Sequence, residues 1–296
     1  PATRTWTRSS PRAASAPARW AAVAMLAAVA AALSNGAGLV LLGVAPLGLL
    51  ALRAAGARMP LGLVLACVVV GVATGGLYGT GWRPAFGQPT PTPVVGHVAP
   101  LIQYGLTFLG GPVVSWDGVL AWRWGVVGAG MVLLCTAFVW VSAPSLRLAL
   151  VPWLALAAFS AGAAALTAVG RLGAGMNTAL LSRYATFAVP LWLAVGPLVV
   201  IAIATVRSGT ARTALVVASI AVLGIAVSHG RHSWALGDQR MAVRAAVARR
   251  AAACIVDPAR APDGCYLAIC WSAPFAREGA MELQARRLGP WARSPE

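Results

Sequence analysis

Long apolar runs, separated by short polar or glycine-containing segments, occupy most of the chain and restrict its fold more than any other feature. A helix needs about 20 apolar residues to cross the hydrocarbon layer of a membrane, where every backbone polar group must be satisfied internally. The pattern predicts an all-α fold, a polytopic bundle of about seven transmembrane helices followed by a short extracytoplasmic C-terminal tail. The predicted spans are Trp20–Leu33, Leu39–Leu52, Leu61–Gly79, Val119–Val141, Leu148–Val169, Tyr184–Val206 and Thr213–Ser228.

Composition supports a membrane protein and argues against a nucleic-acid partner. The chain is 59% hydrophobic and 10% charged, with a mean hydropathy of +0.77, whereas a soluble domain is roughly 25% charged. The net charge of +16 does not indicate nucleic-acid binding, because the arginines lie mostly between the apolar runs and in the tail. All 23 basic residues are arginine, which, with abundant alanine, glycine and proline, suggests a GC-rich bacterial genome. We therefore expect a multi-pass protein of the bacterial cytoplasmic membrane, surrounded by membrane lipids.

The first two apolar runs are short, and the segment SNGAG, from Ser34 to Gly38, separates them. Asn-Gly and Gly-x-Gly sequences favour turns, so the favoured interpretation is a tight helical hairpin. The alternative is one long kinked helix that crosses the membrane once. A later apolar stretch, Val98–Leu109, is too short to span and is expected to form an interfacial or re-entrant helix.

Arginines in the short loops predict the orientation of the bundle. With seven spans, one side of the membrane carries the N-terminal segment 1–19 and the loops with Arg4, Arg8, Arg12, Arg19, Arg53, Arg58, Arg147, Arg207 and Arg212. The positive-inside rule makes that side cytoplasmic. The transmembrane domain 20–233 is then followed by an extracytoplasmic amphipathic helix and tail, 234–296. The opposite side also carries arginines, which weaken the asymmetry without reversing it: Arg83, Arg123, Arg171 and Arg183.

The segment Gly170–Tyr184 (GRLGAGMNTALLSRY) gathers polar side chains between two apolar runs and is the main candidate site. Polar groups at the edge of a hydrocarbon layer need water, a partner or a ligand. Arg171 and Arg183 carry planar forks of donors that match phosphate, and a helix that begins near Ser182 would direct free N–H groups to the same place. The segment therefore predicts a site for a lipid-linked phosphate at the outer surface. In the alternative interpretation, both arginines reach lipid headgroups or loop carbonyls.

Four further residues have both a functional and a structural interpretation. Tyr184 and Trp82 would flank a sugar, or else belong to the aromatic belt at the membrane surface. Asn35 would line the same external cleft, or cap a helix. Asp117 is the one carboxylate between residues 20 and 233, which leaves almost no choice of residue there for a catalytic base and makes Asp117 a candidate. The favoured interpretation of Asp117 is an N-cap at the start of the fourth span.

Other site patterns are missing from the sequence, so neither a cofactor nor a metal is expected. There is no phosphate-binding GxxxxGK, no GxSxG and no His/Cys spacing for zinc, and His229 and His232 lack an evident third ligand. The tail holds Cys254, Cys265 and Cys270. If the tail is external, a disulfide is permitted, and Cys254–Cys265 is the pairing that we expect. Free thiols are the alternative.

Four segments of the chain match a known pattern: SNGAGL, LTFLGGP, GRLGAGMNTALLSRY, and a tail pattern from Cys254 through Asp263-Gly264-Cys265 to Leu283 and Leu288. Together they resemble a family of polytopic bacterial membrane proteins of uncharacterised function. Its members carry S-x-G-N-G-L, F-L-G-x-P and G-R-x-G-x-G-x-x-x-A-x-x-S-R-Y in that order. Asn35 is displaced from the family's glycine–asparagine order, whereas the last pattern is matched at Arg171, Ser182, Arg183 and Tyr184.

That family is distantly similar to the GT-C class of glycosyltransferases, which use polyprenyl-phosphate sugars. The resemblance implies transfer of a sugar from a polyprenyl-phosphate-linked partner, whose phosphate Arg171 and Arg183 would bind. It also implies that the catalytic carboxylate lies in an external loop upstream of Pro1, and that the chain is a C-terminal fragment. The alternative is a non-enzymatic membrane scaffold or assembly component. Transport is disfavoured, because the spans lack buried ionisable residues for a coupling path.

Overall fold

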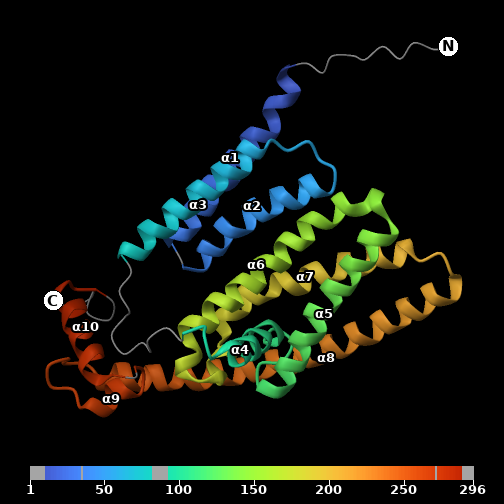
Figure 1. Cartoon of the computed structure of the whole chain (residues 1–296). Coiled ribbons are helices and arrows are strands. Elements are labelled where there is room, and N and C mark those ends of the chain that lie inside the picture. The colour runs from blue at the N-terminus through green and yellow to red at the C-terminus, as the bar shows by residue number, and fades with distance from the viewer. Residues whose placement is uncertain (1–10, 35, 82–92, 271, 289–296) are drawn as a thin grey trace, which may run out of the picture. The chain divides into compact units, whose positions relative to one another are not determined.

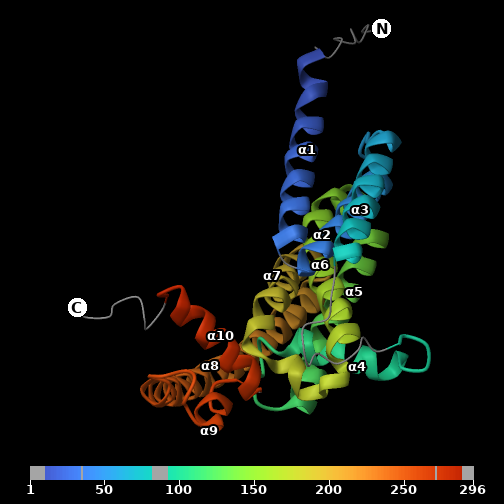
Figure 2. The same ribbon diagram turned by 90° about the vertical axis from the view of Figure 1, so that its left-hand side faces the viewer.

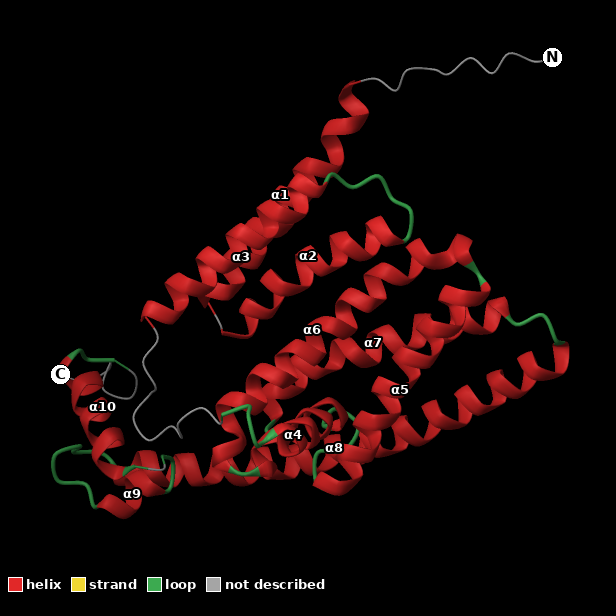
Figure 3. Cartoon of the chain, viewed as in Figure 1, coloured by secondary structure: helices red, strands yellow, loops and turns green. Residues whose placement is uncertain are grey.

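The described part of the chain consists of helices joined by loops and contains no strand (Figure 3). The computed structural model describes residues 11–34, 36–81, 93–270 and 272–288, leaving aside the side chains of 11–22, 81 and 182. The α-helices, labelled in Figure 1, are α1 (Pro11–Ser34), α2 (Leu39–Ala54), α3 (Leu61–Gly81), α4 (Val98–Gly110), α5 (Gly118–Ser142), α6 (Arg147–Arg171), α7 (Ser182–Thr205), α8 (Gly209–Cys254), α9 (Asp263–Leu267) and α10 (Ala273–Ala285). Short 3-10 helices are η1 (Gly36–Gly38), η2 (Pro144–Leu146), η3 (Leu172–Ala174) and η4 (Met176–Leu180). The predicted all-α fold is confirmed.

Six helical segments among the described residues are long and apolar enough to cross a membrane: Gly36–Ala54, Leu61–Thr80, Gly118–Ser142, Pro144–Ala174, Arg183–Thr205 and Gly209–Cys254. Each overlaps a predicted span. The remaining predicted span, Trp20–Leu33, lies in α1, whose described apolar part, Val23–Ser34, is shorter. The chain is therefore a multi-pass helical membrane protein, and the count of seven spans stays a prediction.

The first two apolar runs form a hairpin, as favoured from the sequence (Figure 1). Helices α1 and α2 are separate, and Ala28 and Ala32 of α1 pack against Leu42 of α2. Gly38 allows the close approach of the two helices, because a Cβ atom there would overlap the backbone of Ala31. This packing excludes the single kinked helix.

Helix α4 crosses the long helices instead of running along them. Figure 1 views α4 nearly along its axis, whereas α5, α6 and α7 are seen from the side, and Figure 2 shows α4 lengthwise. With 13 residues, α4 is too short to span a membrane, as predicted. Its buried side chains, Tyr104, Phe108 and Leu109, belong to the same core as those of α5, α6 and α7.

Two glycines bring α4 and α5 into backbone contact. A Cβ atom at Gly110 would overlap the carbonyl of Ala121, and one at Gly125 would overlap the carbonyl of Leu106. Small residues at helix contacts are the usual way in which membrane helices approach closely. The indole N–H of Trp192 in α7 donates to the Leu109 carbonyl at 2.9 Å, which satisfies one of the carbonyls left open at the end of α4. The segment LTFLGGP is thus explained by packing.

The chain divides into two units between Gly230 and Arg231. In the second unit Tyr266 is fully buried and donates its hydroxyl to the Pro258 carbonyl at 2.7 Å. Arg277 lies over the Tyr266 ring, 5.3 Å from its centroid, and pairs with a carboxylate at 2.6 Å, that of Asp263. A disulfide joins Cys254 and Cys265, whose Cα atoms lie 6.0 Å apart, within the ordinary range for a bridged pair.

Helix α8 runs without a break from Gly209 to Cys254. It therefore joins the last predicted span, Thr213–Ser228, to the amphipathic helix expected after residue 234. Gly230 lies between these two parts, and it does not end the helix because a single glycine costs only about 1 kcal/mol relative to alanine. The helix also contains no proline, so no residue in it removes a backbone donor.

Candidate functional site

The two arginines of the candidate segment occupy the facing ends of two long helices. Arg171 is the last residue of α6, and Arg183 is the second residue of α7. Between them the chain forms η3 and η4, and it turns at Gly175, where φ is +97° and ψ is 153°. That backbone region is open essentially to glycine alone. The glycine-rich sequence is therefore required by the turn that connects the two arginine-bearing helix ends.

A buried tyrosine of α4 lies beneath this turn. Tyr104 has no exposed surface, and its hydroxyl lies 3.0 Å from the hydroxyl of Thr178 in η4. The Thr178 hydroxyl also lies 2.8 Å from the Gly175 carbonyl, to which it donates. Either hydroxyl can be the donor in the bond between Tyr104 and Thr178. The bond ties the arginine-bearing segment to α4.

Both arginines act electrostatically on the Tyr104 phenol. Burial raises the pKa of Tyr104 above its ordinary value, the hydrogen bond with Thr178 lowers it, Tyr184 raises it, and the positive charges of Arg171 and Arg183 lower it. Arg171 and Arg183 thus flank the turn that Thr178 ties to Tyr104, and their joint binding of a phosphate stays a prediction.

Tyr184 holds the guanidinium of Arg183 against the bundle. The central carbon of that guanidinium lies 5.1 Å from the centroid of the Tyr184 ring, which is a cation–π distance. The Tyr184 ring packs in turn on Phe108 of α4, with centroids 5.6 Å apart. Arg183 is exposed, whereas Arg171 is half-buried. The site thus presents one exposed and one half-buried guanidinium, with the exposed one positioned by an aromatic ring.

Helix α7 begins at Ser182, at the place predicted. Its N-cap residue, Leu181, provides no side-chain hydrogen bond to the first turn. A helix start of this kind carries backbone N–H groups that lack intrahelical partners and favour an anion. The Ser182 side chain lies outside the described residues, so its predicted contact with phosphate stays a prediction.

Of the other predicted site residues, Asp117 has a structural role, and two fall outside the part of the chain that the structure describes. Asn35 and Trp82 lie outside the described residues. Asp117 is the N-cap of α5, where its carboxylate accepts the Leu120 N–H at 2.8 Å. The favoured interpretation of Asp117 as a cap is confirmed, and it commits the carboxylate to a structural hydrogen bond.

His229 lies among aromatic rings and not in a metal site. Its ring centroid is 5.9 Å from that of Trp116 and 5.9 Å from that of Trp124. The described residues hold no group of three or more His, Cys, Asp or Glu side chains that could bind a metal ion. This part of α8 therefore contributes to an aromatic cluster at the end of α5.

Tyr104 and Thr178 were missed from the sequence. The available signal was a tyrosine within the short apolar helix that precedes LTFLGGP, but nothing in the pattern linked it to a threonine far along the chain. With these residues included, the site holds two guanidinium groups, a helix start and a hydroxyl pair that fixes the turn, an arrangement suited to an oxyanion such as phosphate. Compared with protein-family models, curated proteins and solved structures, the chain has no match.

Proposed function

We propose that this protein binds the phosphate of a polyprenyl-phosphate-linked sugar at the outer face of the bacterial cytoplasmic membrane, as part of a glycosyltransferase. The observation that carries the proposal is the placement of Arg171 at the end of α6 and of Arg183 at the start of α7, on either side of a turn that Thr178 ties to the buried Tyr104 hydroxyl. A guanidinium matches two phosphate oxygens at once. Two of them beside a helix start favour a group that carries more than one negative charge.

The proposed chemistry gives the arginines an electrostatic role. When an acceptor hydroxyl attacks the sugar carbon, its oxygen forms the new glycosidic bond and its proton passes to solvent. The electron pair of the broken carbon–oxygen bond stays with the phosphate, which gains negative charge. Preorganised positive groups stabilise that charge more strongly than water does. Tyr104 is a positioning residue in this scheme, because its hydroxyl is engaged with Thr178 and keeps the turn, with both arginines, on α4.

A second candidate function is a non-enzymatic membrane component that binds the lipid carrier without transferring its sugar. One observation favours it. Asp117, the one carboxylate between residues 20 and 233, is engaged as a helix cap, so this region offers no uncommitted carboxylate as a general base. The two functions share the phosphate site and differ in whether sugar is released from the carrier.

The test is a titration of polyprenyl phosphate with the protein in nanodiscs. Arg183→Gln should weaken binding about tenfold, as expected for the loss of a charge-assisted hydrogen bond. Arg123→Gln is the matched control, because Arg123 is an exposed arginine of α5 that does not belong to the segment; it should bind like the wild type. Unchanged binding by Arg183→Gln would remove the basis of the proposal. With a polyprenyl-phosphate-linked sugar as the ligand, binding without release of the sugar would favour the second function.

The side of the membrane on which the arginine segment lies can be tested by locating the C-terminal tail, which the predicted topology places on the same side. We propose an extracytoplasmic C-terminus on the basis of the arginine distribution in the loops. The Cys254–Cys265 disulfide agrees with an oxidising compartment. A periplasmic phosphatase fused after Glu296 should then be active, whereas a fusion after Leu146 in the loop between α5 and α6 should be silent. The reverse pattern would put the arginine segment in the cytoplasm.

A further inference from the structure

An apolar groove of about 640 Å³ lies between α7 and α8, with Met131 of α5 also lining it. This volume is within the range of roughly 300–1,000 Å³ typical of ligand pockets. The walls consist mainly of valine, isoleucine, leucine and alanine side chains, and the charged or hydroxyl-bearing lining residues are Arg212 and Ser219. The groove is distinct from the site at Arg171 and Arg183, neither of which lines it.

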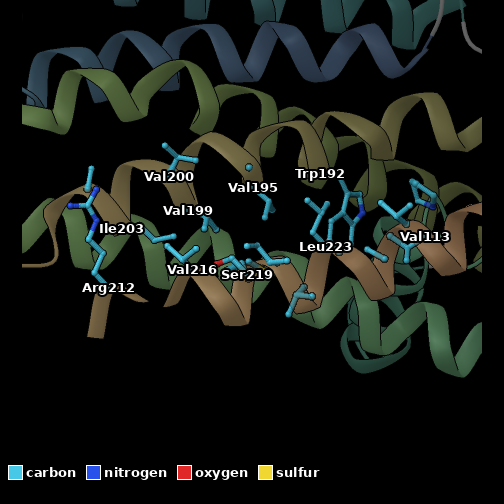
Figure 4. A pocket seen from close by; sticks show the side chains of 18 residues that line it. Val113, Trp192, Val195, Val199, Val200, Ile203, Arg212, Val216, Ser219 and Leu223 are labelled. Atoms are coloured by element: carbon cyan, nitrogen blue, oxygen red, sulfur yellow. The ribbon is translucent and has the colours of Figure 1, made fainter. Parts of the chain in front are cut away.

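The groove carries its positive charge at one end. Figure 4 shows Arg212 at that end, and Trp192 and Val113 at the opposite end. Arg212 lies in the first turn of α8, and within the described chain its guanidinium forms no ion pair with a carboxylate. An arginine at the edge of an apolar slot extends its stem along the slot and directs its charge to the polar boundary.

The length of the groove matches one leaflet of a membrane. Along α7 its lining runs from Trp192 to Ala204, about 18 Å at the rise of an α-helix. The hydrocarbon of one leaflet is about half of the ~30 Å core, or about 15 Å. A lipid chain that starts at the boundary near Arg212 would therefore fill the groove to its far end.

We propose that this groove binds an anionic phospholipid, with one acyl chain along α7 and α8 and its phosphate at Arg212. An amphiphile with a single anionic head fits a slot that is apolar along its length and cationic at one end. A second copy of the chain fits less well, because its one carboxylate in residues 20–233, Asp117, caps α5. On the predicted topology, the carboxylates of residues 234–296 lie on the other side of the membrane from Arg212. On the predicted topology the lipid belongs to the cytoplasmic leaflet.

The test uses native mass spectrometry of the delipidated protein, titrated with phosphatidylglycerol or with phosphatidylcholine of the same acyl chains. The wild type should retain one phosphatidylglycerol with about fivefold higher affinity than phosphatidylcholine, as expected for one arginine at an anionic headgroup. Arg212→Gln should remove this preference. Arg207→Gln is the charge control, because Arg207 lies in the preceding loop and does not line the groove.

A second variant tests the groove itself. Gly196 lines the groove, and a Cβ atom there would have no heavy atom within 4 Å, so Gly196→Leu should fill the space without disturbing the helix. It should lower the affinity for both lipids at least fivefold. Gly224→Leu is the matched control, since Gly224 is equally open on α8 but does not line the groove; it should bind both lipids like the wild type.

Three outcomes would overturn the proposal: equal affinity of the wild type for the two lipids, full lipid binding by Gly196→Leu, or a dimer that Gly196→Leu dissociates. The last would make the groove a protein interface. Polyprenyl phosphate binding separates this proposal from the proposed function. Arg212→Gln should leave that binding unchanged, and Arg183→Gln should leave the phosphatidylglycerol preference unchanged.

Discussion

Helices α4 and α8 both pack on α5 and α7, but they do so in opposite ways. Helix α4 makes backbone contact with α5 at Gly110 and Gly125 and buries Tyr104 and Phe108 completely or nearly so. In α8, by contrast, none of the residues from Gly209 to Gly230 is buried, and the groove of about 640 Å³ separates it from α7. Helix α4 is thus tightly packed on the bundle, whereas α8 is loosely packed on it.

The comparison shows that apolar composition alone does not decide packing inside a membrane. Both helices are apolar, and lipid tails solvate apolar side chains as well as protein does, so helix association depends on close fit and on hydrogen bonds. Helix α4 has both, through its glycine contacts and the Trp192 N–H bond to Leu109. At the α8 contact large side chains face a groove. This difference explains why the arginine segment is fixed over α4, whereas a groove remains beside α8.

The largest expected effect comes from a substitution that disrupts the close contact between α4 and α5. In Gly125→Leu the new side chain would occupy the space of the Leu106 carbonyl, and because both groups belong to helix backbones, α4 and α5 must separate. We expect a loss of more than about 4 kcal/mol of unfolding free energy, or failure to fold. Gly130→Leu is the control, because a Cβ atom at Gly130 meets no heavy atom within 4 Å. Thermal unfolding in detergent measures both, and equal melting points would contradict the close-contact argument.

The loss of unfolding free energy on replacing a leucine by alanine can be compared between the buried side of α7 and the groove side of α8. Leu198 is fully buried in α7, whereas Leu223 of α8 is 63% exposed and lines the groove. Leu198→Ala should cost roughly 2–3 kcal/mol, because its removal leaves a cavity, and Leu223→Ala should cost less than about 0.5 kcal/mol. Thermal unfolding of the two variants checks this. Similar losses would mean that the groove side of α8 is packed as tightly as the buried side of α7.

The spans and the arginine segment could be predicted from the sequence, because they depend on local patterns. Apolar runs of spanning length identify helices whatever their neighbours, and Arg171, Gly175 and Ser182 mark the ends of two helices and the turn between them. The contact between Tyr104 and Thr178 could not be predicted in this way, since the two residues are far apart in the chain and no periodicity relates them. The groove depends on the distance between α7 and α8, which composition does not encode.

Trp192 belongs to both regions, because it donates to Leu109 of α4 and also lines the groove beside α8. Trp192→Phe keeps an aromatic ring but leaves the buried Leu109 carbonyl without its donor. The expected cost is about 1–2 kcal/mol in unfolding free energy, measured by thermal unfolding. Trp122→Phe is a suitable control, since Trp122 is 37% exposed on α5. A loss no greater than in this control would mean that the indole bond does not secure α4.

The smallest expected effect concerns the hydroxyl that ties the arginine segment to α4. Tyr104→Phe removes the bond to Thr178 but keeps the buried ring, so it should cost about 1 kcal/mol. It should also change the pH dependence. Burial raises the pKa of Tyr104 in the folded protein, so the stability linked to its neutral form is present below about pH 10 and is lost as pH rises through the higher folded pKa. The wild type should therefore lose stability in this alkaline range more steeply than Tyr104→Phe. The measurement is the melting temperature of the wild type and of Tyr104→Phe between pH 9 and 11. If it falls equally with pH in both proteins, the packing of α4 does not depend on this hydroxyl.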